Sequence, residues 1–425
     1  MTAAVRRSFD SLSVPNYRRY FTGQLVSLSG NWMQIVAEVW LILSLTGSGL
    51  AVGLTTALQF LPILIFGALG GLLADRFSKR NLLLGTQLAM MVPVLALAAV
   101  TLAGVVAPWM VYALVFARGL VIAVDNPTRQ AFVIEMVGPD RVVNAVSLNS
   151  VLVHGARIAG PAVAGIVIAI AGVGYCFLIN ATTFVAMLIA LRLMVPAELR
   201  TAPPSGAGPG AIRAALRYVW ATPALKLPLV LMALLGTVGL NFQVIVPLLA
   251  RFTFQGDASA YAILLAAMGA GSIVGALVTG ARNQTGSATI TGAALAFGVL
   301  ALLASAAPSL ALEVPVMALL GAAAVTFAAT INSLMQLAVE PAMRGRVMAL
   351  YTVVVLGSNP IGAPLIGWIS EAYAPRAALV VMAAAGLTVA LLARIGFARI
   401  EVARPGANPK SSAVSPAESN LQVEG

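Results

Sequence analysis

Residues 70–81 read GGLLADRFSKRN and place four charged side chains between two long apolar runs. The run before them, residues 51–74, carries no charge, and the chain turns apolar again after Asn81. This pattern predicts a short loop between two membrane-spanning helices. Lys and Arg are common in such loops because they set the orientation of a membrane protein, whereas acids contribute little to it. Asp75 therefore needs another explanation, since it lies next to the membrane end of a helix.

The rest of the chain has the composition of an integral membrane protein. Of its 425 residues, 60% are hydrophobic and 9% are charged, against about 25% charged in a soluble domain. The mean hydropathy is +0.96. A span needs about 20 apolar residues, and stretches of that length tile the chain. We expect an all-α membrane protein with transmembrane helices at residues 20–45, 50–74, 82–103, 109–130, 142–171, 174–194, 223–250, 258–280, 288–306, 312–335, 343–371 and 377–397.

The net charge of +11 reflects the unequal distribution of basic residues between the two sides of the membrane. Among the 25 Lys and Arg residues, Arg118 and Arg157 fall in the middle of spans, and Arg251 and Arg376 fall in one set of alternating loops. The others fall in the second set of loops and at the termini. Basic residues accumulate on the cytoplasmic side of a membrane, so we expect both termini in the cytoplasm. The basic charge therefore does not indicate a nucleic-acid partner.

The longest internal loop divides the spans into two halves of six. We expect an N-terminal bundle at 1–194, a cytoplasmic linker at 195–222, a C-terminal bundle at 223–400 and a disordered cytoplasmic tail at 401–425. Residues 140–165 align without gaps with residues 343–368, and Pro161 falls on Pro364. Parallel repeats of this kind are typical of transporters that rock two halves about a central site.

Residues 71–80, GLLADRFSKR, resemble the loop signature G-x-L-x-D-R-x-G-R-R of the major facilitator superfamily. Ser78 departs from it, since the family usually has glycine there. The resemblance, over about residues 15–400, implies the major facilitator fold. It also implies a cytoplasmic gate, in which the aspartate caps the helix starting near residues 344–348 and the bases pair with an acid on span four. A plain orienting loop is the alternative. The gate residues are then Gly71, Asp75, Arg76, Lys79, Arg80 and Asp125.

A second segment, GARIAGPAVAG at residues 155–165, resembles the glycine-proline signature of antiporters on span five. Proline bends a helix and glycine lets helices approach closely, so packing alone is an alternative explanation. Together with DNPTRQAF at residues 125–132, this segment resembles the subgroup of bacterial enterobactin-exporter and multidrug-exporter type. The predicted kink residues are Gly155, Gly160, Pro161 and Gly165.

Ionic side chains within the spans predict a coupling site, because a charge near mid-bilayer costs at least about 2.5–3.5 kcal/mol. On span one a polar stripe occupies an arc of about 80° at helical spacing; its members are Gln24, Ser27, Asn31, Gln34 and Glu38. We expect the stripe to face a central cavity, with burial against neighbouring helices as the alternative. Glu38 is predicted to interact with Arg118, so that protonation of Glu38 frees the arginine. A purely structural ion pair is equally compatible.

Two further residues on span five, His154 and Arg157, share one helix face and complete the predicted proton-coupling set. His154 could relay protons or could simply pack through hydrogen bonds. Substrate binding is assigned to polar groups of both halves and one aromatic ring. These residues are Asn31, Gln34, Glu38, Phe60, Asn241, Gln243, Asn332 and Gln336.

The residue inventory excludes several other activities. The chain has one cysteine, Cys176, and one histidine, so no disulfide, metal site or cofactor is expected. It has no G-x-x-x-x-G-K-[ST] loop for ATP, and no nucleophile constellation of an enzyme. The leading interpretation is a monomeric, proton-coupled exporter of amphipathic small molecules such as drugs or siderophores, in the bacterial inner membrane. The alternatives are a lysophospholipid or lipid translocase, an uncoupled uptake permease, and a membrane sensor or scaffold that does not transport.

Overall fold

We describe the fold from a computed structural model, which covers residues 9–200, 211–282, 286–341 and 343–402. Within these ranges the chain is almost entirely helical, and twelve of its helical segments are long and apolar enough to cross a membrane. The predicted all-α architecture with twelve spans is therefore confirmed. The tail after residue 402 and the linker piece at 201–210 lie outside the described residues.

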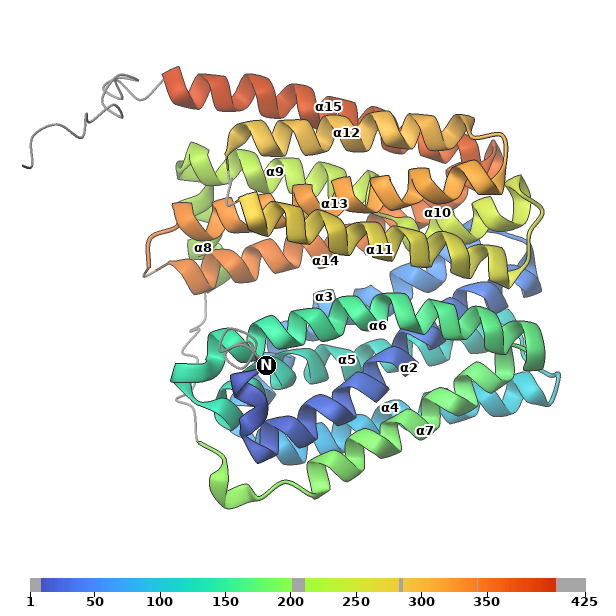
Figure 1. The fold of residues 1–425 in the computed structure, drawn as a ribbon, viewed down its shortest axis with the longest axis vertical. Helices are drawn as coiled ribbons and strands as arrows, with labels where there is room; N and C mark the ends of the chain where they lie inside the picture. The colour runs from blue at the N-terminus through green and yellow to red at the C-terminus, as the bar shows by residue number, and fades with distance from the viewer. Residues whose placement is uncertain (1–8, 201–210, 283–285, 342, 403–425) are drawn as a thin grey trace, which may run out of the picture.

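Six long helices form the N-terminal bundle, drawn in blue to green in Figure 1. Their bounds are α2 (Pro15–Thr46), α3 (Gly49–Arg76), α4 (Lys79–Leu102), α5 (Pro108–Val137), α6 (Val142–Ala171) and α7 (Val173–Arg192). Proline opens α2 and α5, where its missing N–H has no intrahelical partner to lose. Gly47 ends α2 with a φ of 62°, which L-residues with a side chain rarely adopt. These local signals fix the short turns that keep neighbouring spans antiparallel.

The C-terminal bundle contains the remaining spans and one short surface helix. The bounds are α8 (Ala211–Ala221), α9 (Pro223–Val238), α10 (Phe242–Leu248), a π-helical turn (Leu249–Thr253), α11 (Ala258–Arg282), α12 (Ser287–Ala306), α13 (Leu310–Ala338), α14 (Arg344–Ala372) and α15 (Pro375–Val402). Single 3₁₀ turns precede α2, join α5 to α6 and follow α7 (Asp10–Ser13, Pro139–Arg141 and Pro196–Glu198).

The seventh span is broken, although its sequence predicts one continuous helix. Helix α9 ends at Val238, and α10 restarts after Asn241. Asn241 is buried and donates from Nδ2 to the carbonyl oxygen of Thr237, 2.7 Å away. Interrupted membrane helices expose backbone groups where polar solutes bind in transporters. The break therefore places a polar position inside the C-terminal bundle.

The two bundles meet at one end, which we call the far end: the end where α2 stops and α3 begins. There α3 packs against α14, and α6 packs against α11. At the α3–α14 crossing a side chain on Gly49 or Gly53 would collide with the backbone of Gly367 or Ala363. Glycine is required at this crossing because the two backbones nearly touch.

At the opposite end, which we call the linker end because α7 stops and α8 lies there, the bundles separate (Figure 1). Gly71 of α3 and Gly345 of α14 lie toward this end, and a Cβ on either would meet no atom within 4 Å. The same two helices that touch at the far end are thus apart here. The structure is closed at the far end and open at the linker end.

Helix α8 carries the basic amphipathic segment that follows the linker. Ala215 and Val219 are fully buried against the bundle, whereas Arg213 and Arg217 are exposed. The helix contacts α14 and α9. Its basic face lies at the linker end of the C-terminal bundle.

Candidate functional site

An ion pair joins α2 and α5 inside the N-terminal bundle. Nη2 of Arg118 lies 2.8 Å from Oε2 of Glu38, and each residue is 2% exposed. The predicted interaction between these two residues is confirmed. Nε of Arg118 has no hydrogen-bond partner among the described residues. The guanidinium of Arg118 therefore contacts the Glu38 carboxylate through Nη2 and not through Nε.

A chain of amides extends from this pair to α7. Nε2 of Gln34 donates to Oε1 of Glu38 at 2.6 Å, and Nδ2 of Asn180 donates to Oε1 of Gln34. Asn180 is fully buried and also accepts from Oγ1 of Thr183 at 2.8 Å. The sequence-based assignment missed Asn180, although an amide in the middle of an apolar span was a usable signal. The network fixes the orientation of Glu38 from the side opposite Arg118.

The polar stripe of α2 does not face a central cavity as predicted. Gln24, Ser27, Gln34 and Glu38 are all buried. The side chains of Gln24, Gln34 and Glu38 bond to α5 and α7 of the same bundle, whereas Oγ of Ser27 has no partner among the described residues. The alternative, burial through hydrogen bonds with neighbouring helices, is the one observed. Asn31 alone among the stripe is partly exposed, and its Oδ1 has no partner among the described residues.

A second ion pair within α5 corrects the predicted gate. Asp125 pairs with Arg129 one turn later, and also accepts from Oγ1 of Thr86 at 2.6 Å and Nε2 of Gln87 at 3.0 Å. Its assignment as the acid that pairs with the loop bases is wrong. Asp125 lies twelve residues from the end of α5 at Val137, or about 18 Å along the helix axis. Among the described ion pairs, Lys79 of the loop pairs with Glu135 and not with Asp125.

Two of the three loop bases, Lys79 and Arg80, are held by groups at the ends of α5 and α7. Nζ of Lys79 lies 2.7 Å from Oε1 of Glu135, and Arg80 donates to the carbonyl oxygens of Leu191 and Arg192 at 2.8 and 3.2 Å. Glu135, two residues from the end of α5, is the acid that the sequence analysis should have chosen. The α3–α4 loop is therefore fastened to its own bundle.

The predicted contact of Asp75 with the start of α14 stays a prediction. Asp75 is partly exposed, and Arg76 and Arg344 are exposed. A Cβ added to Gly71 would meet no atom of another segment within 4 Å.

Arg157 lies near the midpoint of α6, and its guanidinium is 5.1 Å from the centre of the Trp32 ring. It is partly exposed, and no carboxylate of the described residues lies within ion-pairing distance of it. The side chain of His154 lies outside the described part of the chain, so the predicted relay through it stays a prediction. Trp32 of α2 is the group that the Arg157 guanidinium contacts.

The predicted binding residues of the C-terminal bundle differ in their exposure. Gln336 is exposed and donates to Oδ1 of Asn332, which is partly exposed. Asn241 is buried at the helix break, and Gln243 follows it. Oδ1 of Asn241 and Oε1 of Gln243 are buried without a partner among the described residues. Phe60 is partly exposed on α3.

The glycine-proline segment of α6 serves close packing. Helix α6 runs through Pro161 without a break. A side chain on Gly160 would collide with Trp32 and Met33 of α2, and one on Gly165 would collide with Ala262 of α11. Gly155 has no neighbour within 4 Å. The close approach predicted for glycine is thus confirmed at two of the three positions.

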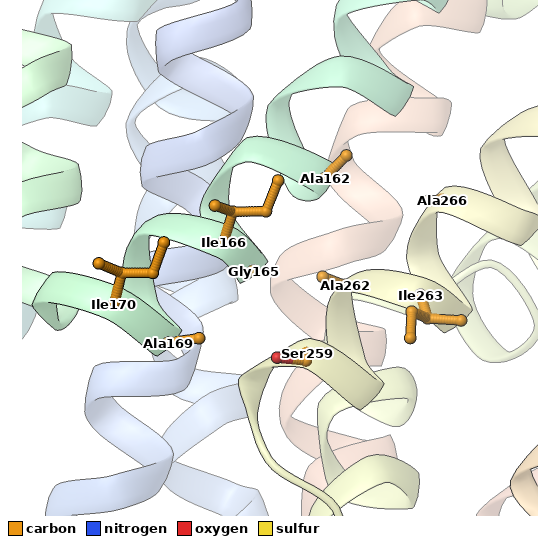
Figure 2. Close-up of a pocket in the computed structure, with 9 residues that line it drawn as sticks. All are labelled: Ala162, Gly165, Ile166, Ala169, Ile170, Ser259, Ala262, Ile263 and Ala266. Carbon is orange, nitrogen blue, oxygen red and sulfur yellow. The ribbon is translucent and has the colours of Figure 1, made fainter.

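Figure 2 shows a pocket of about 460 Å³ at the seam between α6 and α11. Its lining is apolar apart from one hydroxyl, and three of its isoleucines are at least half exposed: 61% for Ile166, 82% for Ile170 and 50% for Ile263. Ala162, Gly165, Ala169, Ser259, Ala262 and Ala266 complete it. It is separate from the Glu38–Arg118 pair and has the surface of a lipid-facing groove.

Two acids of the C-terminal bundle were not anticipated. Glu371 at the end of α14 accepts hydrogen bonds from the first residues of α3. Glu313 in the first turn of α13 is fully buried, and neither of its carboxylate oxygens has a partner among the described residues. Each lies within four residues of a helix end. Charged residues are common at the ends of membrane helices, so neither acid stands out in the sequence.

Two six-helix bundles that touch at one end and separate at the other define a membrane transporter of the major facilitator class. The sequence matches the family described as transmembrane secretion effectors over residues 7–422, and the chain belongs to this family. It is a multi-pass protein of the bacterial cell membrane. Its fold and its relatives are those of transporters.

Three curated relatives illustrate the range of the family. The staphyloferrin A transporter of Staphylococcus aureus is 24% identical over 262 residues, 61% of this chain and 65% of that protein. That alignment therefore spans just under two thirds of the relative. The multidrug efflux pump Tap of Mycolicibacterium fortuitum is 25% identical, with 82% of this chain and 87% of that protein aligned. The enterobactin exporter EntS of Salmonella typhimurium is 26% identical, with 85% and 87% aligned.

Solved structures confirm the fold. The nucleoside transporter NupG superposes with a TM-score of 0.71 at 13% identity and covers 90% of this chain and 99% of its own. A bacterial homologue of the iron transporter ferroportin, in its inward-facing state, superposes with a TM-score of 0.71 at 14% identity and covers 90% and 98%.

Proposed function

We propose that the chain is a proton-coupled exporter of amphipathic small molecules such as drugs or siderophores, working by alternating access. The observation that carries this proposal is the buried Glu38–Arg118 pair, because a family of transporters has little other use for an ionisable pair in a membrane helix. The names of the relatives Tap and EntS support export over uptake. The relatives differ in cargo, so they support the class and not one substrate.

Proton coupling would work through the partners of Glu38. With Glu38 ionised, Arg118 is neutralised and both side chains are tolerated in the bundle. When Glu38 takes up a proton, Arg118 is left with an uncompensated charge inside the membrane, and the bundle must rearrange. The amides of Gln34 and Asn180 hold the carboxylate in place through either state, because an amide can both donate and accept.

We also propose that the linker end faces the cytoplasm and that this conformation is inward-open. The distribution of Lys and Arg supports that orientation. Cargo would then enter at the open linker end and leave after the bundles rock about the α3–α14 and α6–α11 contacts.

The test is transport into or out of proteoliposomes with an imposed pH gradient. The probes are a panel of fluorescent dyes and enterobactin. We expect gradient-driven movement in the wild-type protein and its loss in Glu38→Gln, which keeps the shape of the side chain but not its charge. Asp10→Asn is the control, since Asp10 forms an exposed ion pair with Arg141 away from the membrane interior. Intact gradient-driven transport in Glu38→Gln would remove the coupling role from Glu38.

A lipid translocase is the second candidate, and the seam groove between α6 and α11 favours it. The groove is apolar and open to the side, as an acyl chain would require. Flipping of a fluorescent lysophospholipid in the same proteoliposomes, without any gradient, would support this candidate over the exporter.

A further inference from the structure

Among the described charged side chains in the middle of the N-terminal bundle's helices, one cation, Arg157, has no counter-ion. Glu38 is paired with Arg118, and Asp125 with Arg129. Arg157 has no carboxylate within ion-pairing distance among the described residues, and its guanidinium donates no hydrogen bond to them. An unpaired charge at mid-membrane is costly and marks a functional position. We propose that Arg157 and Trp32 bind a carboxylate of the transported solute, an inference that rests on the proposed transport function.

Arg157 lies where both bundles contribute to the surroundings. On α6, Gly160 faces α2 and Ile158 faces Gly269 of α11. At about 100° per residue, Arg157 falls on the arc between these two contacts. Its guanidinium reaches Trp32 of α2 and remains partly exposed. The side chain is therefore on the face of α6 that is turned to the seam between the halves, where a transported solute passes.

The geometry of the Arg157–Trp32 contact leaves the binding edge of the arginine free. A cation–π contact covers the face of the guanidinium, while its N–H groups point outward in the plane. That planar fork matches the two oxygens of a carboxylate. Trp32 also holds the side chain in one orientation, which lowers the entropy lost on binding. The contact therefore prepares Arg157 to accept an anion in its plane.

The neighbouring surface defines the rest of the solute. Along the face of α6 that is turned to α11, Arg157 is followed by Ile158 and then by Ala162 at the edge of the apolar groove. These side chains offer no hydrogen bond. The expected ligand is therefore an amphipathic carboxylate, with its anionic group at Arg157 and an apolar or aromatic body beside it.

The paired acids argue against a cationic solute. The sequence analysis assigned Glu38 to substrate binding, and a carboxylate there would favour a cation. In the structure that carboxylate is 2% exposed and already neutralised by Arg118. The one mid-membrane charge of this bundle that is both unpaired and partly exposed, within the described ranges, is positive.

The test compares two probes that differ only in charge: dansylglycine, which has a carboxylate, and dansylglycinamide, which does not. Each is titrated at equilibrium against the full chain in lipid nanodiscs, and binding is followed by dansyl fluorescence. We expect the wild type to bind dansylglycine about tenfold or more tightly than the amide, as a charge-assisted hydrogen bond provides. Arg157→Gln should abolish this preference and Arg157→Lys should retain part of it. Arg251→Gln, at an exposed arginine near the far end, is the matched control.

Equal binding of the two probes by the wild type, binding of neither, or a preference that survives in Arg157→Gln would overturn the proposal. Trp32→Leu provides a second variant in case Arg157→Gln does not fold, and it should weaken dansylglycine binding while sparing the amide. The measurement uses no gradient, so its failure is distinct from a failure of proton coupling. Gradient-driven export that persists without any carboxylate preference would leave the proposed function standing and remove this inference.

Discussion

Glu371 of one bundle is hydrogen-bonded to Ser48 of the other. Its carboxylate accepts from Oγ of Ser48 and from the N–H of Leu50, 2.9 Å away, and so caps the first turn of α3. Ser48 caps the same helix by accepting from the N–H of Ala51 at 3.1 Å. An anion at a helix N-terminus is stabilised by the free N–H groups and the helix dipole. This contact fastens the far end across the bundles.

The same two helices carry the predicted gate at their other ends. Asp75 lies in the last turn of α3, and α14 begins at Arg344, opposite it in the antiparallel pair. Each helix thus has an acid near its C-terminal end that can cap the N-terminal end of its partner. Because rocking opens one end as it closes the other, we expect the Glu371 cap on α3 and an Asp75 cap on α14 to be favoured in different conformations.

Replacing Glu371 by Gln should favour opening of the far end. The neutral amide loses the attraction to the start of α3, which is worth about 0.3–1 kcal/mol for an exposed group, so the closed-to-open ratio should fall about two- to fivefold. Spin labels at Val105 and Tyr373, which are exposed at the far ends of the two bundles, report the separation by double electron–electron resonance. An unchanged distance distribution would show that the Glu371 contact does not bias the equilibrium.

Asp75→Asn should act in the opposite direction. Without the acid, a closed linker end loses its cap on α14, and the population should move further toward the conformation described above. Labels at Leu193 and Leu337, both exposed near the linker end, measure this separation. A shorter distance in Asp75→Asn than in the wild type would contradict the gate. Combining the variant with Glu371→Gln should return the population toward the wild-type value.

Much of the fold could be predicted because the constraint is simple. Spans must be apolar and about 20 residues long, and charges are confined to their ends. The break in the seventh span was missed since Gly239 and Asn241 are small or neutral and leave the hydropathy of the segment unchanged. A polar residue in the middle of an apolar span can be recognised from sequence as a candidate functional residue. Which helix it contacts depends on tertiary packing and does not follow from the span alone.

The candidate site, like the fold, could be predicted from the sequence only in part. Helical periodicity predicted that Glu38 and Arg118 are functional partners, because each is an unmatched charge within its own span. The resemblance to the family's loop signature failed for Asp125, since the nearer Arg129 in the same helix competes for the carboxylate. Helical periodicity also could not see Glu371, because an acid at a helix end looks like ordinary surface charge until the second bundle is placed beside it.

Close approach at the far end leads to a steric prediction on α3. A side chain on Gly53 would collide with the backbone of Ala363 and Pro364, so Gly53→Leu should prevent closure of the far end. Gly67→Leu on the same helix is the control, since a Cβ there meets no atom within 4 Å. We expect the Val105–Tyr373 label distance to lengthen only in Gly53→Leu. Lengthening in both variants would mean that helix α3 itself, and not its contact with α14, was disturbed.

Removing one partner of the buried pair should cost more stability than removing both. Arg118→Gln leaves Glu38 as an ionised or newly protonated group without its counter-ion, and breaking a buried pair in this way costs about 3–5 kcal/mol. The double variant Glu38→Gln/Arg118→Gln places two neutral amides side by side and should recover much of that loss. Thermal unfolding in detergent, followed by the fluorescence of a thiol dye at the buried Cys176, gives the order of midpoints. If the double variant unfolds at or below the midpoint of Arg118→Gln, the charge of Glu38 is not what Arg118 compensates, and the coupling mechanism built on their separation loses its physical basis.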